Sequence, residues 1–271
     1  MARAGDGVQS LERAFDLVEL LADAPGEVSL SALAARSGLA PSTIHRLMGT
    51  LVGRGWARRL PSRRYILGPR LIHLGERASR TMDTLAQPYL ARLVDEIGET
   101  ANLALRDGDR VVYAAQVPSR HSMRMFTEVG RHVWLHCTGV GKVLLAQLPP
   151  GAARAVLERT GMPARTPQTF TDVDRLLVEL SGIAARGFAI DDGEQETGVR
   201  CLAVPVPGKG AEAALSVSGP EGRLPLDAVP RIVPLLQAAA AALAGELSGT
   251  PADGRAGPGR AGGGAPARRI G

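Results

Sequence analysis

The residues with the clearest chemical character are eight arginines in a segment that contains no acid. Between Val28 and Gly75 there is no Asp or Glu, and the arginines are Arg36, Arg46, Arg54, Arg58, Arg59, Arg63, Arg64 and Arg70. A segment of this length normally mixes both signs of charge, so the excess of guanidinium groups predicts a surface that faces a polyanion. Nucleic acid is the first candidate, because guanidinium groups bind phosphates and base edges.

Other residues have the types needed for a catalytic or a metal site. A cysteine hydrolase triad could use Cys201, His136 and Asp191, but no local catalytic signature surrounds the cysteine, and its neighbours indicate a strand interior. The residues that could bind a metal are His121, His132, His136 and Cys137. Only His132 and His136 are four apart, a spacing that does not converge on one metal if the segment is extended. We therefore expect neither an enzyme nor a metal site, and no cofactor.

The elements that would present the arginines are two helices and a hairpin. A short helix over 31–38 stops at Gly38, and Pro41 opens a second helix. Its apolar positions, Ile44, Leu47, Met48 and Leu51, share one face, and Ser42, Thr43, His45 and Arg46 are left on the other. Residues 55–60 and 64–67 predict two strands joined around Pro61, and a preceding helix has apolar spacing at Val8, Leu11, Ala14, Phe15, Val18 and Leu21. Together these elements predict a winged helix-turn-helix.

The totals indicate a folded chain of two domains. It has 271 residues, 45% of them hydrophobic, and a net charge of +5. Residues 1–80 carry +5, residues 81–248 carry −3, and the remainder carries +3, so the basic character lies at the two ends. Two cysteines are too few for a disulfide framework. We find no signal-peptide core and no apolar run near ~18 residues, so we expect a cytoplasmic protein with no membrane partner.

The rest of the chain mixes helices and strands. Residues 70–84 and 85–97 have helical patterns, and Asp107-Gly108-Asp109 joins strands at 100–105 and 110–117. Further strands are predicted at 123–127, 188–190, 201–206 and 213–218, and helices at 139–147, 152–159, 172–186 and 226–247. This predicts an α+β domain with a mainly antiparallel sheet. We expect a winged-helix domain at 1–68, a linker helix at 69–84, a second domain at 85–248, and a disordered tail at 249–271.

Eight segments, in order, resemble the signatures of the IclR family of bacterial transcription regulators. They are Val8–Ala14, Gly38–Leu47, Tyr65–Gly68, Gly98–Leu103, Glu128–Gly130, Leu135–Lys142, Gly198–Cys201 and Leu215–Pro220. The resemblance implies an N-terminal winged helix that binds double-stranded operator DNA as a dimer or a pair of dimers. It also implies a C-terminal domain, similar to GAF domains, that binds a small metabolite.

The candidate DNA-binding residues lie on the second helix and the hairpin. Ser42, Thr43, His45 and Arg46 open the helix that enters the major groove in this motif, where hydroxyl groups suit phosphate and Arg46 suits a guanine edge. We assign phosphate contacts to the wing arginines, which are Arg58, Arg59, Arg63 and Arg64. The alternatives are a solvated helix face, with Ser42 as a cap, and generic surface charge.

The resemblance carries the family's effector pocket onto Gly139, Val140, Asp191, Cys201, Ser216 and Ser218. Backbone N–H groups of residues 139–141 would open a helix, and Ser216 and Ser218 share one strand face, so the set suits a carboxylate. It is also possible from the residues alone that Ser216 bonds across strands, Cys201 is a packing residue and Asp191 caps a turn. The chain as a whole could instead be a metabolic enzyme with a vestigial helix-turn-helix, or a coactivator-like module without its own operator.

Overall fold

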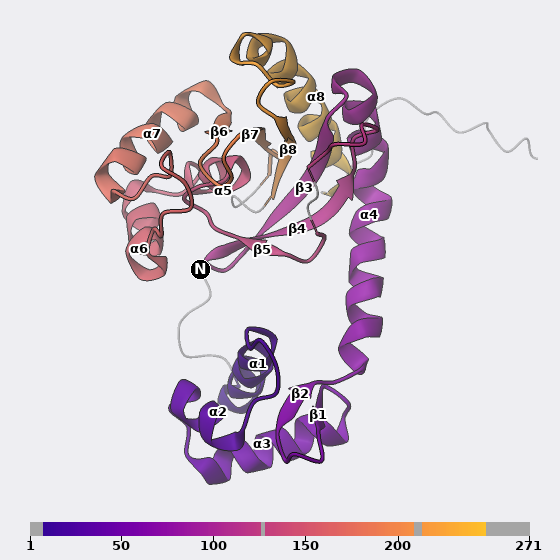
Figure 1. Cartoon of the computed structure of the whole chain (residues 1–271), viewed down its shortest axis with the longest axis vertical. Coiled ribbons are helices and arrows are strands. Elements are labelled where there is room, and N and C mark those ends of the chain that lie inside the picture. The colour runs from indigo at the N-terminus through magenta and orange to yellow at the C-terminus, as the bar shows by residue number, and fades with distance from the viewer. Residues whose placement is uncertain (1–7, 126–127, 209–212, 248–271) are drawn as a thin grey trace, which may run out of the picture. The chain divides into compact units, whose positions relative to one another are not determined.

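The computed structural model describes residues 8–125, 128–208 and 213–247. The chain divides into two compact units, Met1–Met82 and Asp83–Gly271. One helix, α4 (Arg70–Ile97), begins in the first unit and ends in the second (Figure 1). The expected tail at 249–271 lies outside the described residues.

The first unit contains three helices and a two-stranded hairpin. Its elements are α1 (Gln9–Ala22), α2 (Leu30–Ser37), α3 (Pro41–Gly53), β1 (Ala57–Arg59) and β2 (Tyr65–Leu67). The Ser29 hydroxyl accepts a hydrogen bond from the Ala32 amide at 3.1 Å and caps α2, which ends at Gly38 in the left-handed region. Proline opens α3, and β1 pairs antiparallel with β2, so the predicted winged helix-turn-helix is confirmed.

The core of this unit forms mainly where the sequence predicts it. Ile44, Leu47, Met48 and Leu51 are all buried on α3. The expectation for α1 is wrong at its N-terminal end, because Val8, Leu11 and Phe15 are exposed and the buried residues are Leu17, Val18 and Leu21. Apolar spacing alone could not show which turns of α1 the small unit covers.

The two helical patterns from Arg70 to Ile97 form one continuous helix. Gly75 and Pro88 both lie inside it. The part beyond Met82 buries Ala86, Leu90, Leu93 and Val94 in the second unit. This packing outweighs the poor helix propensity of Pro88, whereas Gly75 lies in an exposed part of the helix.

The second unit is an α+β domain built on one antiparallel sheet. Its remaining strands are β3 (Thr100–Asp107), β4 (Arg110–Val117), β5 (His132–Val133), β6 (Ala189–Asp192), β7 (Val199–Pro205) and β8 (Ala213–Pro220). They are ordered β5-β4-β3-β8-β7-β6, and the β3–β4 hairpin turns at Gly108, whose φ is 56°. The helices are α5 (Gly139–Leu145), α6 (Pro150–Thr160), α7 (Val173–Arg186) and α8 (Val229–Leu247), the last preceded by a 3₁₀ turn at Leu226–Ala228.

Helices cover both faces of the sheet in this unit. Strand β8 is buried over nearly its whole length, because α5 packs on one face and α8 packs against β7 and β8 from the other (Figure 1). Residues Leu226–Glu246 are long and apolar enough to cross a membrane by composition alone. Ile232, Leu236, Ala240 and Leu243 are buried on this segment, which is the pattern of a helix that packs one face against the sheet.

One predicted strand is wrong. Residues 123–125 are not in a strand, and residues 126–127 lie outside the described part. The strand beside β4 at this edge of the sheet is instead β5, where His132 pairs with Val112 and Val133 with Val111. Alternation of residue types over a few positions does not show which segment finds a partner strand.

The hairpin of the first unit depends on a close backbone approach at Gly68. Its amide donates to the Trp56 carbonyl at 2.8 Å, and a Cβ at this position would lie 2.1 Å from the Gly55 carbonyl oxygen. We expect Gly68→Ala to destabilise the first unit by about 1–3 kcal/mol, the usual cost of overpacking. The measurement is urea unfolding followed by Trp56 fluorescence in a Trp134→Phe background.

Gly53→Ala is the matched control, because an added Cβ there meets nothing within 4 Å. It should unfold at the urea concentration of the parent protein or slightly above it, because alanine favours a helix more than glycine does. A Gly68→Ala protein as stable as this control would show that the hairpin can shift to accept a side chain.

Candidate nucleic-acid interface and effector site

The exposed face of α3 is polar and basic, as the sequence predicts. Ser42, His45 and Arg46 are exposed, and Thr43 is half-buried. Within the described part of the chain, the side chains of His45 and Arg46 form no hydrogen bond or ion pair. A guanidinium group that the protein leaves unpaired keeps its donors for an external partner.

The hairpin presents the four wing arginines to solvent. Arg58, Arg59, Arg63 and Arg64 are all exposed. The turn is closed by the Arg63 and Leu60 amides, which donate to the Leu60 and Arg64 carbonyls, each at 2.9 Å. Arg63 has a φ of 61°, a left-handed conformation that costs energy in a residue with a side chain. The turn therefore holds the four positive charges close together on the hairpin.

Two other residues of this segment contribute to the fold. Arg36 donates from Nη1 to the Leu20 carbonyl at 3.1 Å and so ties α2 to α1. Trp56 is half-buried and packs against the core of the first unit. The arginines of the acid-free segment therefore do not all serve one surface.

In the second unit, register brings most of the predicted effector residues onto neighbouring strands. Asp191 of β6 pairs with Cys201 of β7, and Cys201 pairs with Ser218 of β8. Two residues along β8, Ser216 pairs with Ala203. Side chains two residues apart share a face of the sheet, so these polar groups lie together.

Helix α5 lies directly on this patch. A Cβ on Gly139 would be 3.1 Å from the Cys201 Sγ, and a Cβ on Gly141 would be 2.4 Å from the Leu135 carbonyl oxygen. The Thr138 hydroxyl caps α5 by accepting from the Gly141 amide at 3.1 Å. The Gly141 amide, expected to be free for an anion, is therefore already bonded.

Four of the six predicted residues, Asp191, Cys201, Ser216 and Ser218, thus lie on neighbouring strands. The other two, Gly139 and Val140, open α5, and Gly139 packs against Cys201. Val140 is fully buried and its side chain belongs to the apolar core. Only the backbone of Val140 could therefore contact a polar ligand.

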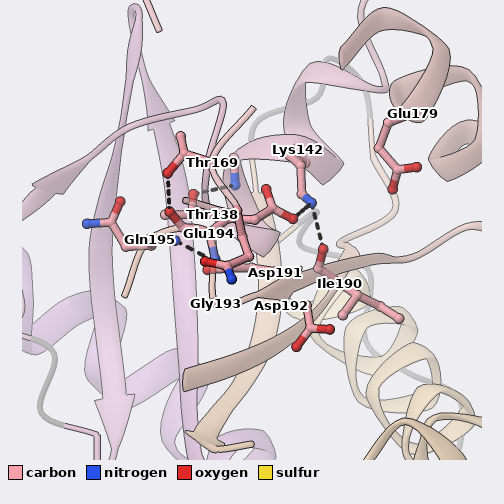
Figure 2. A network of polar contacts seen from close by, with 12 residues as sticks. Thr138, Lys142, Thr169, Glu179, Ile190, Asp191, Asp192, Gly193, Glu194 and Gln195 are labelled. Atoms are coloured by element: carbon pink, nitrogen blue, oxygen red, sulfur yellow. Dashed lines mark hydrogen bonds and ion pairs between the residues drawn. The ribbon is translucent and has the colours of Figure 1, made fainter. Parts of the chain in front are cut away.

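A buried ion pair near this patch is absent from the sequence predictions. Lys142 and Glu194 are both buried and bonded to each other, and Lys142 Nζ also donates to the Ile190 carbonyl at 2.6 Å (Figure 2). Thr169 donates to the Glu194 carbonyl at 2.6 Å. One feature of the sequence could have indicated this ion pair. Lys142 is one of only two lysines in the chain, and it lies among apolar residues in a helix.

The electrostatics of Asp191 follow from its burial. Its Oδ1 accepts from the Glu194 amide at 2.8 Å and the Gln195 amide at 3.3 Å. Burial, followed by the Glu194 carboxylate, raises the pKa of Asp191 to about 7, against the lowering effect of those amides and Lys142. The Asp191 carboxyl group therefore changes charge near neutral pH.

The structure gives no support to a cysteine nucleophile. Burial raises the pKa of Cys201 to about 12 and that of Cys137 to about 12, so both thiols stay protonated at neutral pH. His136 Nε2 donates to the Pro163 carbonyl at 3.1 Å, and burial lowers its pKa. Among the described residues, no group of three or more His, Cys, Asp or Glu side chains could hold a metal ion.

The two units define a class of protein: a winged-helix regulator that carries an effector domain. The chain belongs to the IclR family. Residues 10–61 match the model of the IclR helix-turn-helix domain, and residues 78–244 match that of the bacterial transcriptional regulator IclR C-terminal domain. It is a transcriptional regulator and not an enzyme.

Named relatives and a solved structure agree with this assignment. The chain is 36% identical to the HTH-type transcriptional regulator BhcR of Paracoccus denitrificans over 82% of this chain and 81% of that protein. It is 35% identical to the transcriptional repressor IclR of Escherichia coli over 84% and 86%. An IclR homolog from Microbacterium hydrocarbonoxydans complexed with 4-hydroxybenzoate has a TM-score of 0.66 and 25% identity, over 89% of this chain and 99% of that one.

Asp191 should make stability depend on pH. The pKa of Asp191 is raised in the folded protein. Its contribution to the free energy of unfolding is therefore fully present below about pH 4 and is lost as the pH rises through about 7. Asp191→Asn keeps the acceptor for the two amides and cannot ionise. We therefore expect the free energy of unfolding of the variant to rise relative to that of the wild type between pH 5 and pH 8. The expected rise is a few kcal/mol, because each pKa unit corresponds to about 1.4 kcal/mol. Urea unfolding at both pH values measures this.

Asp227→Asn is the control, because Asp227 is an exposed aspartate of the same unit. Its unfolding curves should follow those of the wild type at both pH values. An Asp191→Asn protein whose stability difference from wild type does not change with pH would contradict the raised pKa.

Proposed function

We propose that this regulator binds operator DNA with α3 in the major groove and the β1–β2 hairpin on the phosphate backbone. The observation that carries the proposal is the division of α3 into a buried apolar face and a largely exposed polar face, on which the Arg46 side chain has no partner among the described residues. Arg46 would read a guanine edge, with Ser42, Thr43 and His45 beside it. Arg58, Arg59, Arg63 and Arg64 would bind phosphates. A regulator that reads chromosomal DNA acts in the cytoplasm.

We infer that the effector is a small carboxylate bound beneath α5. The supporting features are the hydroxyl groups of Ser216 and Ser218, the backbone of Gly139 and Val140, and the neighbouring Asp191 and Cys201. The solved homolog holds 4-hydroxybenzoate, which is itself a small carboxylate. An anion entering this patch approaches Asp191, and protonation of that carboxyl group would remove the repulsion.

We further propose that two copies associate, as a dimer or a pair of dimers. Val8, Leu11 and Phe15 are 61%, 55% and 55% exposed along one side of α1. An apolar stripe of this kind on a folded unit suits a second copy of the same chain. The effector would act by favouring one arrangement of the units over another, with α4 as the element that continues from one unit to the next.

DNA binding is tested with the sequence upstream of the protein's own gene. Fluorescence anisotropy across a range of salt concentrations should give an affinity that falls steeply with salt. Arg46→Ala should lose about 1–3 kcal/mol of preference for that sequence over scrambled DNA. Arg58→Ala should weaken both sequences alike and reduce the salt slope by about 1.

Arg54→Ala is the control, because Arg54 is exposed in the same unit but outside the predicted set. It should retain the preference of the wild type. The proposal would be contradicted if the protein showed no sequence preference at any salt concentration and no protected site in footprinting. The protein would then be a coactivator-like module without its own operator.

The effector site is tested by calorimetry with 4-hydroxybenzoate and a panel of small carboxylates. We expect one or more to bind and to change the affinity for operator DNA, since a ligand with equal affinity for both arrangements shifts nothing. Replacing Ser216 and Ser218 together by alanine should abolish the heat of carboxylate binding. Ser181→Ala removes an exposed hydroxyl from α7 and should not change it. Unchanged binding in the double variant would place the ligand elsewhere.

A further inference from the structure

Three polar side chains form a row across the central strands of the sheet. Asn102 of β3 pairs with Gln116 of β4 on one side and with Ser216 of β8 on the other. Ala104, two residues along β3 from Asn102, belongs to the apolar core that includes Val140 of α5. Because residues two apart share a face, Asn102 lies on the face that α5 covers.

The hydrogen bonds of this row are incomplete. Gln116 Nε2 donates to Asn102 Oδ1 at 2.9 Å, which leaves the Asn102 amide nitrogen directed away from Gln116. Asn102 Nδ2 has no partner among the described residues, and Ser216 Oγ has none apart from the nearby Cys201 thiol; both side chains are fully buried. An unsatisfied buried donor is costly, and it is retained in native proteins where another molecule completes it.

The neighbouring row of the sheet shows that the unpartnered Asn102 amide is unusual. Thr100, two residues before Asn102, has its hydroxyl occupied, since Oγ1 accepts from the Ser119 amide at 3.1 Å and donates to the Met125 carbonyl at 3.2 Å. Thr100 pairs with Ser218, and Ser218 pairs with Cys201. The free amide of Asn102 therefore lies about 7 Å along the strand from the row formed by Thr100, Ser218 and Cys201. A small organic acid can span this distance.

We propose that Asn102 is a specificity-determining residue that donates from Nδ2 to a hydroxyl or carbonyl oxygen on the effector's carbon chain. This oxygen is separate from the carboxylate. Gln116 is a positioning residue, because its amide fixes which end of the Asn102 side chain faces the effector. Ser216 offers its hydroxyl beside it. The inference rests on the proposed effector site and specifies the class of acid: one that carries a second oxygen.

The experiment is calorimetry on the full chain with acids that differ by one oxygen. The pairs are benzoate against 4-hydroxybenzoate, and propionate against lactate and pyruvate. In the wild type we expect an oxygenated acid to bind at least about tenfold more tightly than its plain partner. Asn102→Leu should weaken only the oxygenated acid and reduce the ratio to near one.

A second variant changes the donor without touching Asn102. In Gln116→Glu the new carboxylate can only accept, so the Asn102 amide turns to donate to it and is no longer free. This variant should also lose the preference for the oxygenated acid, while its thermal unfolding stays close to that of wild type. Ser181→Ala again serves as the control that keeps the preference.

The outcomes separate this inference from the proposed function. Equal binding of plain and oxygenated acids by the wild type would overturn the role of Asn102 and leave the carboxylate site standing, with a buried water on the amide. A preference that survives in both Asn102→Leu and Gln116→Glu would also overturn it. No binding of any acid would overturn the proposed effector site together with the inference.

Discussion

The buried ion pair between Lys142 and Glu194 is the interaction on which the second unit's geometry depends. Lys142 belongs to α5, and Glu194 belongs to the loop that follows β6, so the pair joins the helix to the end of the sheet. Two charges removed from water are stable only when each is paired and hydrogen-bonded. Lys142 meets this condition through Glu194 and the Ile190 carbonyl, and the loop is held by Thr169. Glu194 Oε2 has no partner among the described residues.

The consequence for the site is that its parts cannot move independently. The Glu194 amide bonds to Asp191, and α5 places Gly139 on Cys201. Helix, loop and strand are therefore positioned by one network (Figure 2). A ligand at the proposed site would have to displace or complete this network, which would offer a physical route from effector binding to a change in the domain.

The first unit follows a different principle. Its folding leaves arginines on the surface without partners, and its turn keeps Arg63 in an unfavourable backbone conformation. Such features cost stability and are retained where they serve binding. Arg36 and Arg80 are exceptions, because the Arg36 guanidinium group bonds to the Leu20 carbonyl and Arg80 pairs with Glu76. At least one arginine of the acid-free segment therefore supports the fold, and composition alone does not separate it from the exposed ones.

Much of the architecture could be predicted from the sequence, because the signals are local. Apolar spacing identified the buried face of α3, and Asp107-Gly108-Asp109 identified the β3–β4 turn. The exposed face of α1 and the strand at His132–Val133 could not be predicted, since both depend on which partner a segment meets. The same holds for the unbroken α4, where tertiary packing outweighs Pro88.

By itself, the sequence determined the class of the protein: a winged helix rich in arginine, followed by an α+β domain, in an order that resembles the IclR family. Only the tertiary structure decided how the second domain's polar groups combine. The pairing of Lys142 with Glu194 and the free amide of Asn102 depend on strand register and on a helix crossing the sheet. These contacts join residues up to 114 positions apart, between Asn102 and Ser216. No local pattern records such a separation, because hydrogen-bond satisfaction can be assessed only when every neighbour is in place.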